Sequence, residues 1–179
     1  GNISAGKYSS TTNLEGNLRH VGFLLAKGIA RNLNSLIYTS VESVVWRRQS
    51  FPFPLKKFDR ERMLAELQAP DTEPGVKVSN VALLCCQDYN AKPEYTMRLL
   101  ELGKAKILFM PGEPFVEYQL YAQSLIADQF IATAANCSDD FLYLPTAEAF
   151  GSGYESKSFC RTTEEFEIRC KMALEKLLL

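Results

Sequence analysis

Residues 95–114 read YTMRLLELGKAKILFMPGEP, and this stretch decides the fold. Two apolar runs, residues 95–102 and 105–110, flank Gly103-Lys104, which predicts a β-hairpin. The second run leads directly into the turn Pro111-Gly112-Glu113-Pro114. Because α/β folds gather ligand-binding groups at the carboxyl ends of strands, Glu113 is the first candidate functional residue.

The local chemistry of Glu113 supports two interpretations. Pro114 suits the first position of a helix, where its missing N–H group would have no partner in any case. Glu113 would then be the N-cap, a position that Asp, Asn or Ser fills better than Glu. A poor cap at the end of a strand indicates another role for Glu113. The alternative is that its charge simply complements the helix dipole.

The segments before this hairpin alternate between helix and strand patterns. Apolar residues recur at helical spacing over residues 14–34, and residues 36–48 are rich in β-branched and aromatic side chains. Asp59 can cap a short helix, and residues 78–88 form an apolar run of helical length.

The segments after the hairpin continue the same alternation. A helix is expected after Pro114 and a strand over residues 130–135. Thr162 and Glu165 predict a capping box at the start of a last helix. One face of that helix would carry these apolar residues: Phe166, Cys170, Ala173 and Leu177. The fold class is therefore α/β or α+β, a mixed β-sheet with packed helices in a single domain over residues 1–179.

Composition excludes several functions. The net charge is −1 and the basic residues are scattered, so nucleic acid is not expected as a partner. No apolar run approaches the ~20 residues of a membrane span. The five cysteines show no Cys-x-x-Cys spacing, although a disulfide between Cys160 and Cys170 stays open. His20 is the single histidine, which rules out a self-contained His-rich zinc site within these residues.

Three further segments carry candidate groups. The chain opens with Gly1-Asn2-Ile3-Ser4-Ala5-Gly6, a loop-like stretch without Met, so we expect further polypeptide upstream. Tyr143 stands in Tyr143-Leu144-Pro145-Thr146, where a tyrosine between apolar residues is commonly a core residue. Tyr154 follows Gly151-Ser152-Gly153 in the run of residues 151–155, which predicts a flexible loop.

Taken in order, these segments resemble the neutral ceramidases, zinc-dependent amidases that cleave the N-acyl bond of ceramide, and within them bacterial ceramidase-like proteins. The resemblance implies that Ser4 is the nucleophile, that Glu113 and Tyr143 are zinc ligands, and that Tyr154 lies beside the scissile amide. It covers most of the chain but only the later part of the family's catalytic domain. The family's two histidine ligands precede the serine segment and have no counterpart here.

The resemblance thus implies part of a zinc-dependent amidase, with a lipid or other small amide as substrate. We expect no hydrolysis by these residues alone, and weak zinc binding at most. The implied partners are a missing N-terminal half or a second copy of the chain. Family members are often exported, which implies a secreted or periplasmic parent protein, although these residues do not establish the compartment.

Two alternatives remain open. The first is a non-catalytic or vestigial domain that keeps the fold and binds a partner chain. The second is an independent enzyme that uses Glu113 with Asp139 or Asp140 as paired carboxylates, for which the sequence offers no spacing argument.

Overall fold

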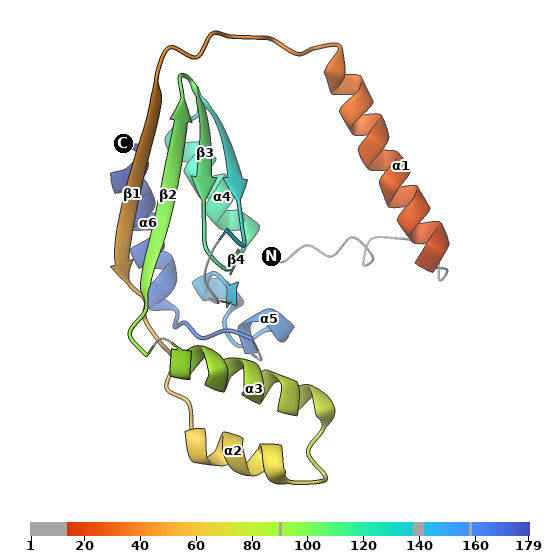
Figure 1. The fold of residues 1–179 in the computed structure, drawn as a ribbon, viewed down its shortest axis with the longest axis vertical. Coiled ribbons are helices and arrows are strands. Elements are labelled where there is room, and N and C mark those ends of the chain that lie inside the picture. The colour runs from red at the N-terminus through yellow and green to blue at the C-terminus, as the bar shows by residue number, and fades with distance from the viewer. Residues whose placement is uncertain (1–13, 90, 138–141, 158) are drawn as a thin grey trace. The chain divides into compact units, whose positions relative to one another are not determined.

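The computed structural model describes residues 14–89, 91–137, 142–157 and 159–179 (Figure 1). Its contacts divide the chain into two compact units, one ending at Val41 and the other beginning at Glu42. None of the described helices combines the length and the apolar character that crossing a membrane would require.

The first unit contains one long helix, α1 (Leu14–Leu33), as its periodicity predicts. Its apolar side chains are exposed, among them Leu18, Leu25 and Ile29. His20 is also exposed on this helix, as expected for a surface residue.

The second unit is built on a mixed four-stranded sheet. The strands are β1 (Val44–Pro52), β2 (Glu94–Leu102), β3 (Ala105–Phe109) and β5 (Phe130–Ala134), in the order β1-β2-β3-β5. The first three pair antiparallel, and β5 pairs parallel to β3. The predicted hairpin is confirmed, with Gly103 at φ 59° in the turn. The mixed sheet with packed helices confirms the predicted fold class.

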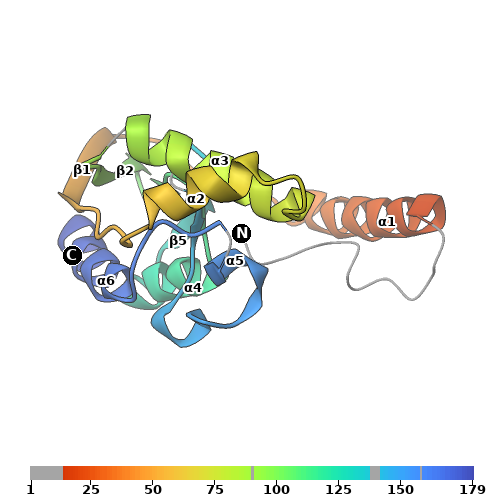
Figure 2. The same ribbon diagram turned by 90° about the horizontal axis from the view of Figure 1, so that it is seen from below.

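Two helices, α4 (Val116–Leu125) and α6 (Glu165–Leu178), pack on the same face of the sheet (Figures 1 and 2). This inner face carries alternate residues of β2, namely Tyr95, Met97 and Leu99, all of them buried. The four residues expected on one face of the last helix (Phe166, Cys170, Ala173, Leu177) are all buried there. The opposite, outer face exposes Val44 and Phe130 on its two edge strands.

A helical hairpin lies between β1 and β2 in the chain. It consists of α2 (Arg60–Gln68), with the predicted Asp59 N-cap, and α3 (Pro74–Tyr89). Met63, Leu83 and Leu84 form its own small core, against which Leu142 packs. The hairpin therefore contacts the residue that directly precedes Tyr143.

The strand predicted over residues 36–48 is displaced in the structure. Strand β1 begins at Val44 because its register is set by β2, from the Val44–Leu102 pair to the Pro52–Glu94 pair. Residues 36–40 have the composition of a strand, but they are exposed and do not pair with a neighbouring strand.

The predicted capping box is wrong. Thr162 is buried in an isolated bridge with Leu55, and its hydroxyl donates to the Pro54 carbonyl at 3.1 Å. Helix α6 instead has Glu164 at its N-cap, without a side-chain capping bond. Thr162 lies in this bridge two residues before the N-cap, so it is not at the position from which a side chain caps α6.

All five cysteine thiols are free in the structure, with Cys160 and Cys170 both buried. The disulfide left open by the sequence is thus not formed between them.

Candidate active site

The candidate site centres on a second, very short sheet. Strands β4 (Glu113–Pro114) and β6 (Tyr143–Leu144) pair in parallel, which places Glu113 opposite Tyr143. The Glu113 amide donates to the Leu142 carbonyl at 2.8 Å, and the Phe115 amide donates to the Leu144 carbonyl at 3.2 Å. Two residues far apart in sequence are therefore held side by side by backbone hydrogen bonds.

This pairing corrects the prediction that Glu113 caps a helix. The N-cap of α4 is Phe115, and Pro114 lies in β4 rather than in the first helical turn. Because the backbone at Glu113 is committed to the ladder with β6, its side chain is free of a capping role. The capping explanation for an acidic residue here no longer applies.

The turn before Glu113 depends on a glycine. Gly112 is buried at φ 71°, a left-handed conformation that glycine adopts without steric cost. Its carbonyl accepts a hydrogen bond from the Asn136 amide at 2.8 Å, and the Met110 amide donates to the Ala134 carbonyl at 2.9 Å. These two hydrogen bonds hold the turn against the end of β5 and the residues that follow it.

Two buried tyrosines donate hydrogen bonds to the backbone beside β4 and β6. The Tyr95 hydroxyl donates to the Pro111 carbonyl at 2.9 Å, and the Tyr118 hydroxyl donates to the Pro145 carbonyl at 3.0 Å. Both rings meet Phe166 edge-on, with centroids 5.0 and 5.8 Å away. Burial raises the pKa of both phenols, so they remain protonated donors.

These anchors were not predicted from the sequence. Tyr95 read only as one member of a strand and Tyr118 as one apolar member of a helix. The available signal was a polar hydroxyl within each apolar run, since a buried hydroxyl requires a partner.

Tyr143 is electrostatically coupled to its neighbour. Its pKa is raised, first by burial and then by the negative charges of Glu113 and Glu155. The phenol is therefore held in its protonated form. A cation bound between these two oxygens would reverse this preference, because a nearby positive charge favours the phenolate.

Tyr154 joins the same cluster from α5 (Gly153–Lys157). Its ring centroid is 6.5 Å from that of Tyr143, at an interplanar angle of 72°. The sequence predicted a flexible loop here, but Gly151 and Gly153, both at positive φ, form a turn into this short helix. Its exposed phenol rests on Phe159, with the two centroids 5.0 Å apart.

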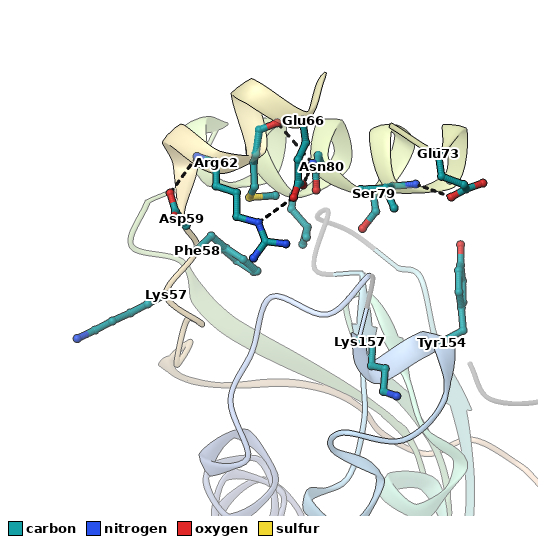
Figure 3. A pocket seen from close by; sticks show the side chains of 14 residues that line it. Lys57, Phe58, Asp59, Arg62, Glu66, Glu73, Ser79, Asn80, Tyr154 and Lys157 are labelled. Atoms are coloured by element: carbon teal, nitrogen blue, oxygen red, sulfur yellow. Dashed lines mark hydrogen bonds and ion pairs between the residues drawn. The ribbon is translucent and has the colours of Figure 1, made fainter. Parts of the chain in front are cut away.

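A pocket of about 730 Å³ opens beside Tyr154, between the α2–α3 hairpin and α5 (Figure 3). This volume falls within the range of small-molecule sites, roughly 300–1,000 Å³. The structure therefore brings Glu113, Tyr143 and Tyr154 together, and of the three Tyr154 lines the pocket. Ser4, Asp139 and Asp140 lie outside the described residues.

The fit to zinc is incomplete. Glu113 and Tyr143 offer two oxygen donors on adjacent strands, whereas catalytic zinc sites use about three protein ligands, most often including histidine. Across the described part of the chain, no group of three or more His, Cys, Asp or Glu side chains is placed to hold a metal. These residues alone do not make a zinc site.

The fold and this cluster define a mixed α/β protein with a carboxylate–phenol pair at the end of a strand. No family model matches the chain, and no curated protein matches it in sequence. Its fold is similar to that of the neutral ceramidase from Pseudomonas aeruginosa, with a TM-score of 0.57 and 12% sequence identity. The match covers 95% of this chain and 33% of the ceramidase chain. The fold is thus ceramidase-like over about a third of that enzyme's length.

Proposed function

We propose that this chain forms part of a zinc-dependent amidase that hydrolyses N-acyl amide bonds. The observation that carries the proposal is the β4–β6 ladder, which pairs Glu113 with Tyr143 beside Tyr154. The motif-based resemblance had given these three residues roles at one site, and the ceramidase-like fold is an independent reason to consider them together.

Each residue has a role that its environment supports. Glu113 and Tyr143 are the metal-binding pair, with Glu113 supplying the negative charge. Tyr154, exposed and close to Tyr143, can donate a hydrogen bond to an oxyanion that develops on the amide. Ser4 is the nucleophile in this proposal, on the resemblance alone. Zinc, once held by further ligands, supplies a Lewis acid.

In this proposal the remaining zinc ligands come from polypeptide outside these residues, because the described part of the chain places no group of three or more His, Cys, Asp or Glu side chains to hold a metal. The isolated chain is therefore expected to bind zinc weakly and to hydrolyse nothing. Equilibrium dialysis against zinc and an assay with an N-acyl substrate test this directly. Zinc-dependent hydrolysis by the isolated chain would contradict the proposal that these residues supply only part of the zinc site.

The decisive experiment begins with the DNA upstream of the codon for Gly1. If it encodes two well-separated histidines in continuous polypeptide, the joined protein should hydrolyse N-acyl amides with zinc. In that protein, Glu113→Gln and Tyr143→Phe should each lower kcat/KM by roughly 10²-fold or more, as loss of a preorganised electrostatic group does. Glu117→Gln is the matched control, an exposed acid in the first turn of α4. Unchanged kcat/KM in the two site variants would refute their assignment.

A non-catalytic domain that binds a partner chain is the second candidate. The observation that favours it is the outer sheet face, where Val44 and Phe130 are 66% and 68% exposed. An unrelated gene upstream, together with no zinc binding, would make this candidate the leading one.

A further inference from the structure

The pocket beside Tyr154 has an unusually charged lining. Its apolar floor is provided by Phe58, Met63 and Leu83. The remainder is largely polar, from both helices of the hairpin and from α5. The lining therefore combines apolar contact on one side with charged and polar groups on the others.

The acidic groups of the pocket are already engaged. Asp59 accepts the Arg62 amide at 3.0 Å, and Glu73 accepts the Val76 amide at 3.1 Å. Glu66 accepts bonds from both Asn80 and Arg62, each at 2.8 Å, and these bonds lower its pKa. Each carboxylate is thus tied to a neighbour within the hairpin.

Arg62 is the basic residue of the pocket whose Nη groups are not used in a hydrogen bond within the hairpin. Its Nε donates to Glu66, and neither Nη group donates a hydrogen bond to any residue in the described ranges. Figure 3 shows its guanidinium on the side of the hairpin that faces α5, and the phenol of Tyr154 pointing from α5 toward the hairpin. Lys57 and Lys157 lie at the rim and point outward.

We propose that this pocket binds an anionic group of a small-molecule ligand, with Arg62 as its anchor. A guanidinium with two uncommitted Nη groups matches the paired oxygens of a carboxylate or phosphate. The rim lysines add long-range attraction without contact. This inference rests on the proposed function in one respect: Tyr154 borders both the pocket and the reaction site, so we take the anionic group to belong to the amide substrate. An uncharged N-acyl amino alcohol such as ceramide would lack that group.

Binding of two matched probes tests the proposal. N-octanoylglycine carries a carboxylate, whereas N-octanoylglycinamide is its neutral counterpart. Isothermal titration of the chain should show the carboxylate binding roughly tenfold more tightly, as expected for a hydrogen-bonded charge. Displacement of this probe by inorganic phosphate extends the ligand class to phosphates, and no displacement confines it to carboxylates.

Two arginines on the same helix provide the variant and its control. Arg62→Gln should remove the preference for the charged probe, and the fold should tolerate it because the side chain is 74% exposed. Arg60→Gln makes the same change in net charge, but Arg60 pairs with Asp88 at 2.6 Å and does not line the pocket. The preference should survive in that variant.

Equal affinity for the two probes, failure of both to bind, or equal behaviour of the two variants would overturn the proposal. The readout is binding without zinc and without hydrolysis. A negative result therefore leaves the proposed amidase activity standing, and absence of activity in a joined protein leaves the pocket proposal standing.

Discussion

Glu113 and Tyr143 form a pair in which the charge of Glu113 adds to the raised pKa of Tyr143. Burial contributes most to the raised pKa of Tyr143, and Glu113 contributes next. Glu113→Gln should therefore lower the pKa of Tyr143 without restoring its ordinary value. Ultraviolet titration of the tyrosines measures the shift, with Tyr143→Phe in each background to assign the signal. An unchanged midpoint would show that the two side chains are not coupled.

Tyr118 makes the stability depend on alkaline pH. Its folded pKa is raised above the ordinary 10.0, so above that pH the unfolded chain loses a proton that the folded chain keeps. The folded state then binds more protons, and the free energy of unfolding falls as pH rises through this range. Tyr118→Phe should cost about 1–2 kcal/mol at neutral pH by removing the bond to Pro145. Its loss of stability on going to about pH 11 should be smaller than that of the unmodified chain. Urea unfolding at both pH values measures this, and parallel losses would contradict it.

At the scale of single residues, the sequence pointed to the candidate site residues but not to the tyrosines that hold them in place. Glu113, Tyr143 and Tyr154 stand in recognisable short motifs, and the structure places them together. Tyr95 and Tyr118 stand in ordinary apolar patterns. Their hydroxyl bonds link segments that only the tertiary fold brings close, so no local pattern reveals them.

Among the elements, those with long periodic patterns were predicted and the shortest were not. Helices α1 and α6 span several turns and show a repeated apolar signal, and α3 was predicted from the length of its apolar run. Strands β4 and β6 have two residues each, too few to show alternation, and their pairing is set by distant segments. The candidate residues could therefore be named from the sequence, but their pairing across β4 and β6 could not.

The turn that leads into β4 should be sensitive to a single methyl group. Gly112→Ala places a Cβ in a left-handed conformation and should cost about 1–2 kcal/mol of stability. It should also disturb the Tyr143 titration, because Glu113 follows directly. Gly22→Ala is the opposite case, a position inside α1 with nothing within 4 Å of the added Cβ, and should stabilise the helix by up to ~1 kcal/mol. Urea unfolding of the two variants measures both effects. Equal effects would show that the backbone at Gly112 is not strained by a side chain.

For the molecule as a whole, two features agree with the proposal that further polypeptide completes it. The candidate site provides two oxygen donors where a zinc site uses more. The sheet is packed by α4 and α6 on its inner face and exposes large apolar side chains on the other. Exposed apolar surface of this kind marks interaction sites. A partial metal site and an exposed sheet face are both expected if further chain completes the fold.

Without that further chain, the outer face should make the protein self-associate. Val44→Lys with Phe130→Lys places two charges on this face, at side chains 66% and 68% exposed, and should yield a monomer in sedimentation velocity. Ile168→Lys with Met172→Lys is the matched control on α6, at side chains 63% and 52% exposed, and should associate as the unmodified chain does. If both double variants associate alike, the outer face is not the contact. If the unmodified chain is monomeric at all concentrations, its exposed apolar residues do not require a partner. The incomplete metal site would then be the remaining reason to expect further polypeptide.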